Sequence, residues 1–150
     1  MSLANYHAVG FYNDVLSVYY SGTDTLQEGY ALCYDVAASL TATDPKARLG
    51  NQCIKPATAN LMAFAGLVGP SSAGKTGPCY IDVIPYNKNR FAYAYCKINA
   101  TAFSTLLGPV DAQYALGAFS DSTVNLNFVG IAAETADTST TAAKKAMLFK

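Results

Sequence analysis

The chain has 150 residues, with ten basic and ten acidic side chains and a formal net charge of zero. This length suits one domain with its own core, and the balanced charge excludes recognition of nucleic acid or of an anionic membrane by bulk electrostatics. Only 13% of the residues are charged, about half the usual share in soluble domains, whereas 51% are hydrophobic. We therefore expect partner proteins to cover much of the surface.

Most of the chain has the pattern of short β-strands. The segment "VLSVYY" is β-branched and aromatic, "EGYALCYD" alternates, and "LMAFAGLV" is a continuous apolar run. The predicted strands cover residues 15–20, 28–35, 61–68, 79–86, 90–98, 113–119, 125–133 and 146–150. The turn residues "NKN" predict a hairpin between the fourth and fifth of these strands.

Helix signals are sparse. The segment "NATAFSTLLGP" at 99–109 predicts two helical turns that stop at Gly108, and "TSTTAAKKA" at 138–146 predicts one more. The predicted fold class is therefore all-β: a small single-domain β-barrel or sandwich of about eight or nine short strands at residues 14–150. Residues 1–13 form an extended N-terminal arm in this prediction.

The N-terminal segment "MSLANYHAVGFYND" has neither a basic start nor a hydrophobic secretory core. No window reaches the roughly 20 apolar residues of a membrane span. We expect a protein kept in the cytoplasm, in which the four cysteines are thiols and most of them act as buried small hydrophobic residues. The four are Cys33, Cys53, Cys79 and Cys96.

Catalytic and metal-binding patterns are scarce. There is no C-x-x-C pair and His7 is the only histidine, so we expect no metal site. A nucleophilic triad or dyad would have to use His7, which lies in the arm. The sequence therefore predicts no catalytic residues, no cofactor and no enzymatic activity.

One motif, in contrast, suggests a nucleotide-binding site. The stretch "GPSSAGKT" from Gly69 to Thr76 satisfies G-x-x-x-x-G-K-[ST], in which Lys75 would reach the terminal phosphates and Thr76 would hold magnesium. A Walker loop leads into the N-terminus of a helix, but here Gly77, a proline and then the strand-like "CYIDVIPY" follow. An exposed loop between two strands is the favoured interpretation, and a P-loop nucleotide-binding protein is the alternative.

Two types of strand occur twice in the same order. The segment "GYALCYD" precedes "LMAFAGLV", and "QYALGAF" precedes "LNFVGIAA". The spacing differs because the first copy carries the long segment 36–56. The sequence suggests a weak internal duplication.

Four segments carry a resemblance to a known family: "LQEGYALCYD", "CIKPATANLMAFAGLV", "GPCYIDVIPY" and "FVGIAAETADTSTTAAKKAMLFK". With these segments the chain resembles the small β-rich decoration, or cement, proteins of tailed-bacteriophage heads. The resemblance covers roughly residues 15–150 and rests on small and aliphatic residues. The Tyr-rich segment 90–109 matches no pattern of that family.

The resemblance implies a non-catalytic virion protein on the outer capsid surface. Such a protein binds the major capsid protein, often as a homotrimer, and ties neighbouring capsomers together, with no nucleic-acid or membrane partner. It would be made in the host cytoplasm and incorporated in the virion. A tail-fibre or adhesin-like module that recognises a host surface is a further alternative.

Tyrosine is the residue we expect at the contacts, because it combines a large rigid area with a polar tip. The chain has eleven tyrosines and no tryptophan. The candidate interface residues are Tyr6, Phe11 and Tyr12 in the arm, and Tyr86, Phe91, Tyr93 and Tyr95 around the predicted hairpin. Phe91, Tyr93 and Tyr95 share one face of a strand, and that face is either part of the core or part of an interface.

Overall fold

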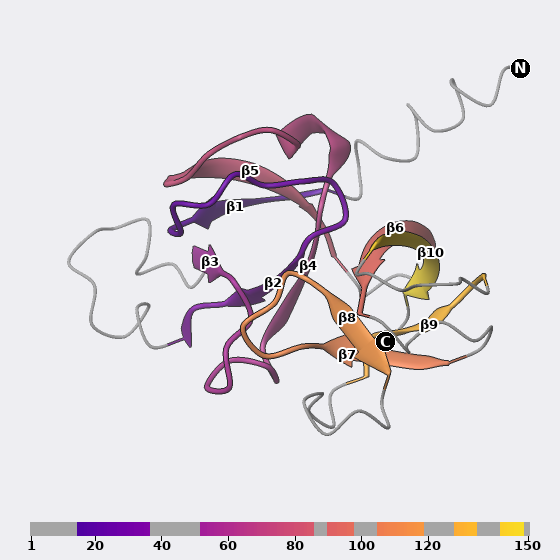
Figure 1. Cartoon of the computed structure of the whole chain (residues 1–150). Coiled ribbons are helices and arrows are strands. Elements are labelled where there is room, and N and C mark those ends of the chain that lie inside the picture. Colours follow the sequence, from indigo (N-terminus) through magenta and orange to yellow (C-terminus); the bar gives the residue numbers. More distant parts are fainter. Residues whose placement is uncertain are drawn as a thin grey trace, which may run out of the picture.

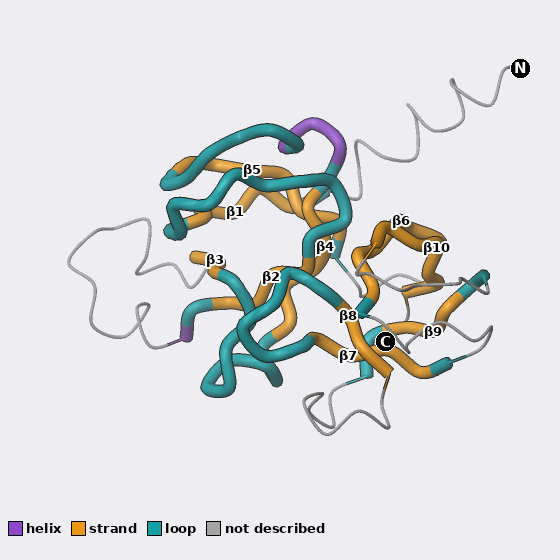
Figure 2. Tube along the Cα trace, viewed as in Figure 1, coloured by secondary structure: helices purple, strands orange, loops and turns teal. Residues whose placement is uncertain are grey.

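The computed structural model describes residues 15–36, 52–85, 90–97, 105–118, 128–134 and 142–148. Within these ranges the chain forms ten β-strands and one short 3-10 helix, η1 (Pro70–Ser72). The strands build two closed five-stranded barrels that lie side by side (Figure 1). Figure 2 shows loops joining most of the described strands. The predicted all-β barrel class is thus confirmed, as two small barrels.

The first barrel contains β1 (Leu16–Tyr20), β2 (Ala31–Tyr34), β3 (Gln52–Ile54), β4 (Phe64–Val68) and β5 (Cys79–Ile84). Its strand order is β1-β3-β2-β4-β5, and β5 pairs with β1 to close it. The β1–β3 pair is parallel, and the other four pairs are antiparallel.

The second barrel contains β6 (Arg90–Cys96), β7 (Leu106–Pro109), β8 (Leu116–Ala118), β9 (Gly130–Ala132) and β10 (Ala142–Leu148). Its strand order is β10-β6-β8-β7-β9, closed between β9 and β10. The β6–β8 pair is parallel and the others are antiparallel. Taken in chain order, the strands of both barrels therefore have the same neighbours and the same directions.

The registers of the two barrels also agree. Leu32 on β2 lies opposite Gly66 on β4, and Leu107 on β7 lies opposite Gly130 on β9. The other strand pairs agree in the same way. Tyr20 lies opposite both Cys53 and Cys79, and at the equivalent place in the second barrel Cys96 lies opposite both Leu116 and Ala142. Likewise, Val68 lies opposite Val83, and Ala132 lies opposite Ala146. The chain is a structural repeat of one barrel.

The structural repeat confirms the suggested internal duplication for the glycine-containing strands and corrects it for the Y-A-L strands. The segments "FAGLV" and "FVGIA" include β4 and β9, the fourth strands of their barrels in chain order. The two Y-A-L segments lead into β2 and β8, which are the second strand of one barrel and the third of the other. They are neighbours in space, because the Ala31 N–H donates a 3.1 Å hydrogen bond to the Tyr114 carbonyl.

Alternation of side chains explains the barrel interiors. In β1 the buried Val18 and Tyr20 alternate with the exposed Ser17 and the half-buried Tyr19. The interior of the first barrel is filled by Val18, Tyr20, Leu26, Leu32, Cys53, Ala65, Val68, Ile81 and Val83. A second buried cluster joins residues on β2, β4 and β5 to the interior of the second barrel, so the two barrels share a core.

Three expectations about local structure are wrong. The segment predicted as helix at 138–146 overlaps β10, whose alanines and lysines favour helix in isolation but pair with β6 along seven residues. The end of the other predicted helix is β7, held between β8 and β9. The predicted hairpin is absent from the described pairing, because β5 pairs with β1 and β4 whereas β6 pairs with β8 and β10.

All four cysteines lie in strands as thiols, and Cys33, Cys53 and Cys96 are buried. Burial raises the pKa of Cys33 from its ordinary value of 9.0 to about 12, and burial likewise raises the pKa of Cys53. These thiols therefore stay protonated in the folded protein at pH values where the unfolded chain ionises.

We expect this difference to make stability fall in alkali. Because the folded pKa of Cys33 is raised, its contribution is complete below pH 9 and is lost progressively between pH 9 and about 12. Urea unfolding of the reduced protein at several pH values would measure this, and Cys33→Ala should show a shallower decline. A free energy of unfolding that rises from pH 9 to pH 11 would contradict the expectation.

Candidate functional site

The G-x-x-x-x-G-K-[ST] segment joins β4 to β5, which are antiparallel neighbours. Its first half contains η1, and β5 begins at Cys79, shortly after Thr76. The strand predicted from "CYIDVIPY" is thus confirmed, and the position of the phosphate-binding helix is taken by a strand. A phosphate at this loop would lack the amides and the dipole of a helix N-terminus.

The polar groups of the loop bind within the chain. Lys75 Nζ donates a 3.2 Å hydrogen bond to the Tyr80 carbonyl, and the Thr76 and Thr25 hydroxyl oxygens are 2.8 Å apart. The buried Ser72 hydroxyl accepts a 2.7 Å hydrogen bond from the Asp82 N–H. These contacts fix the loop on the first barrel.

We expect Lys75→Ala to change the free energy of unfolding by less than about 0.5 kcal/mol, because its side chain is exposed. The matched control is Ser72→Ala, which removes a buried hydroxyl and leaves the Asp82 N–H without its acceptor, and it should cost about 1–2 kcal/mol. Urea unfolding measures the effect of both substitutions.

The loop interpretation also predicts that a calorimetric titration with magnesium and ATP or GTP shows no binding. Micromolar affinity that Lys75→Ala abolishes would contradict that interpretation.

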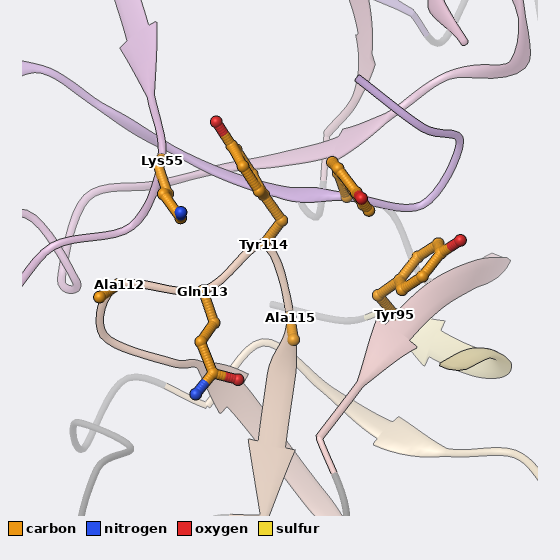
Figure 3. A pocket seen from close by; sticks show the side chains of 7 residues that line it. Lys55, Tyr95, Ala112, Gln113, Tyr114 and Ala115 are labelled. Carbon is orange, nitrogen blue, oxygen red and sulfur yellow. The ribbon is translucent and has the colours of Figure 1, made fainter. Parts of the chain in front are cut away.

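Three tyrosines meet where the barrels join (Figure 3). Tyr30 lies just before β2, Tyr95 lies on β6, and Tyr114 lies just before β8. With Lys55 and Gln113 they line a pocket of about 350 Å³. We call the tyrosines and Lys55 the tyrosine cluster.

A tight turn before β8 positions Tyr114. The Gln113 N–H donates to the Val110 carbonyl at 3.3 Å, and Ala112 has a positive φ of 56°. The Ala112 N–H donates to the Pro56 carbonyl of the first barrel at 3.0 Å. The turn of the second barrel is thereby held on the first.

The Tyr114 hydroxyl makes two hydrogen bonds. It donates to Asp24 Oδ2 at 2.6 Å, and its oxygen is 2.5 Å from that of Tyr20. Because the single phenolic proton of Tyr114 goes to Asp24, the Tyr20 hydroxyl is the donor in the second bond. Tyr114 therefore links the interior of the first barrel to a carboxylate at its surface.

Both faces of the Tyr114 ring are covered. The Tyr30 ring stacks on one, with centroids 4.7 Å apart and an interplanar angle of 7°, and Lys55 Nζ lies 4.9 Å from the Tyr114 centroid. Tyr95 meets Tyr30 edge-on at 4.8 Å, and its hydroxyl donates to Gln27 Oε1. Stacked, edge-on and cation–π contacts of this kind stabilise a junction.

The electrostatics indicate a structural role for these phenols. Burial raises the pKa of Tyr114, and its hydrogen bond to Asp24 raises it further. Burial also raises the pKa values of Tyr20 and Tyr30. The three phenols stay protonated at neutral pH, and those of Tyr20 and Tyr114 hold hydrogen bonds, so they are poor general bases.

The proposed aromatic face on β6 is outside the core. Ala92, Ala94 and Cys96 point into the second barrel and are buried, whereas Phe91 and Tyr93 are 57% and 58% exposed. The core alternative is therefore wrong for these two side chains. Tyr95 is half-buried and belongs to the tyrosine cluster. Interface roles for all three remain predictions.

The other predicted interface residues, Tyr6, Phe11, Tyr12 and Tyr86, lie outside the described residues, as do His7 and the arm at 1–13. The sequence prediction missed Tyr30, Lys55 and Tyr114. The repeated tyrosine in "GYAL" and "QYAL" was a signal for two of them, since both rings lie in one cluster.

Comparison with protein-family models, with curated proteins and with solved structures finds no match to this chain. Within the described ranges, no helix is both long and apolar enough to cross a membrane. The same part of the chain holds no group of three or more His, Cys, Asp or Glu side chains suited to a metal ion.

Proposed function

We propose that this chain is a non-catalytic structural protein that binds the outer surface of a tailed-phage head and stabilises contacts between capsomers. The observation that carries the proposal is the aromatic face of β6, where Phe91 and Tyr93 are more than half exposed. The resemblance of four segments to phage decoration proteins supports the choice of the capsid as partner.

The composition of the chain and the exposed aromatic face of β6 support a protein as the binding partner. Aromatic side chains are enriched in the cores of protein interfaces, where charged residues are depleted. This chain is 12% aromatic and 13% charged. A single contact through one strand would be modest, but repetition over a closed lattice makes weak contacts durable.

Binding of purified protein to capsids that lack it tests the proposal. We expect saturable addition, weakened about tenfold or more by the double variant Phe91→Ser/Tyr93→Ser, as for central aromatic residues of an interface. Tyr80→Ser is the matched control, since Tyr80 is 44% exposed on β5 of the first barrel. Failure of the wild-type protein to add, or equal addition of the double variant, would refute the proposal.

The arm with Tyr6, Phe11 and Tyr12 is the second part of the proposed contact. Its large apolar side chains follow no helical or strand period, so docking on a neighbouring subunit suits them better than burial in their own barrel. Deletion of residues 1–12 should leave a cooperatively melting protein that binds capsids weakly. A truncated chain that binds as well as the full chain would show that the arm is dispensable.

A further inference from the structure

The pocket at the tyrosine cluster holds a lysine whose charge is not paired within the described ranges. Lys55 lines the pocket, and its Nζ lies 4.9 Å from the Tyr114 ring centroid. Lys55 makes no hydrogen bond or ion pair with another residue in those ranges. Asp24, the carboxylate bonded to the cluster, accepts the hydrogen bond of the Tyr114 hydroxyl instead. Because an ammonium group has three N–H donors, Lys55 has donors left for a ligand.

The backbone holds Lys55 at this pocket. Lys55 follows β3 directly, and the carbonyl of the next residue, Pro56, accepts the hydrogen bond from the Ala112 N–H in the turn before β8. The Lys55 side chain is half-buried and points toward that turn, which also carries Gln113 (Figure 3). The Gln113 side chain lines the same pocket and has no hydrogen bond to another described residue. This side of the pocket therefore offers a cation and an amide.

Aromatic rings line the other side of the pocket. Figure 3 shows Tyr95 on the opposite side of Tyr114 from Lys55, and the Tyr30 ring packs on the rings of both Tyr95 and Tyr114. The volume of about 350 Å³ lies within the range of ligand pockets, about 300–1,000 Å³. The pocket is therefore large enough for a single side chain that has an apolar stem and a charged end.

The exposed aromatic face of β6 leads into this pocket. Phe91, Tyr93 and Tyr95 share the outward side of the strand, since alternate residues of a strand point the same way. Tyr95 is both the last of the three and a wall of the pocket. Alternate side chains of any extended chain are about 6–7 Å apart. A partner segment that runs along β6 with one side chain in the pocket therefore places the residue two positions away over Tyr93.

We propose that this pocket binds an acidic side chain of a partner protein whose extended segment lies along β6, with the carboxylate on Lys55 Nζ. A hydrogen bond between an ammonium group and a carboxylate is stronger than one between neutral groups. The pocket has one lysine and the chain has no net charge, which favours a lone carboxylate over the repeated phosphates of a nucleic acid. The inference concerns the chemistry of the contact and does not depend on the partner being a capsid protein.

A peptide with the same residues on both sides of a glutamate tests the proposal, because its direction along β6 does not matter. The probe is acetyl-Leu-Ser-Glu-Ser-Leu-amide, and acetyl-Leu-Ser-Gln-Ser-Leu-amide is the control that keeps the shape and removes the charge. NMR titration of the full-length protein measures both dissociation constants. We expect the glutamate peptide to bind about tenfold or more tightly than the glutamine peptide, as for a charge-assisted hydrogen bond.

The same titration locates the peptide and needs no variant. The largest amide shifts should fall on Tyr95 and on residues 112–115. Absence of binding at millimolar peptide would overturn the proposal, and so would equal affinities for the two peptides. Largest shifts on strands of the first barrel remote from the pocket would also overturn it.

Lys55→Met removes the charge and keeps an unbranched side chain over the Tyr114 ring, so it should abolish the preference for the glutamate peptide. Lys75→Met is the matched control, because Lys75 binds the Tyr80 carbonyl and lies outside the pocket, and it should keep the preference. Tyr93→Ser should weaken both peptides equally. A Lys55→Met protein that still prefers glutamate would refute the proposal. Unchanged affinities in Tyr93→Ser would refute it too, because the segment would then not lie along β6.

Discussion

Gly66→Ala is expected to destabilise the protein by about 3 kcal/mol or more, through positive-φ strain and steric overlap together. Gly66 has a φ of +146°, and a Cβ atom there would overlap the Ile84 carbonyl oxygen and lie 2.6 Å from Val83 Cγ1. Relief would require β4 to move away from β5, with which it is paired in the first barrel.

Gly74→Ala, compared with Gly66→Ala, separates the cost of backbone strain from the cost of steric overlap. Gly74 also has a positive φ, +82°, but a Cβ atom there would meet nothing within 4 Å. Its substitution should cost only about 1 kcal/mol, the effect of an unfavourable backbone conformation. Urea unfolding of both variants makes the comparison, and equal losses would show that the β4–β5 approach is not tight.

Tyr114→Ala should cost about 3 kcal/mol, in the range of large core truncations. It removes the ring between Tyr30 and Lys55 and leaves the hydroxyl of Tyr20 without its acceptor. Tyr114→Phe keeps the ring and removes only the two hydrogen bonds, for an expected loss of about 1–2 kcal/mol.

Tyr93→Phe is the control for loss of a phenolic hydroxyl, because Tyr93 is 58% exposed, and it should change stability by less than about 0.5 kcal/mol. Denaturant unfolding ranks the three variants. If Tyr114→Ala were as stable as Tyr93→Phe, the tyrosine cluster would not hold the barrels together.

Strands with clear alternation or aromatic content could be predicted from sequence. The segments that contain β1, β5 and β6 were predicted with starts and ends within two residues of those observed. The three residues of β3 were missed because "QCI" follows a long loop-like stretch and pairs with β1 and β2 far along the chain. The pairing of β10 with β6 overrides the helix preference of "AAKKA" for the same reason: its partner is remote.

Prediction of the candidate sites was limited in the same way, because these sites depend on contacts between segments that are far apart in the sequence. The outward position of Phe91 and Tyr93 follows from alternation with small residues, although the sequence did not decide between core and surface. The repeated "YAL" pointed to Tyr30 and Tyr114, but their meeting in one cluster depends on the packing of one barrel against the other, which no local pattern encodes. The glycine strands β4 and β9 indicated the repeat, but the matching registers emerged only from the strand pairing.

The central proposal, that this chain decorates the outside of a phage head, is tested most directly by electron cryomicroscopy of the phage particles that we propose it decorates. We predict repeated density on the outer face of the head shell into which the pair of five-stranded barrels fits, with β6 turned toward the capsid protein. Density for the two barrels on the tail, or their absence from the finished particle, would contradict the claim.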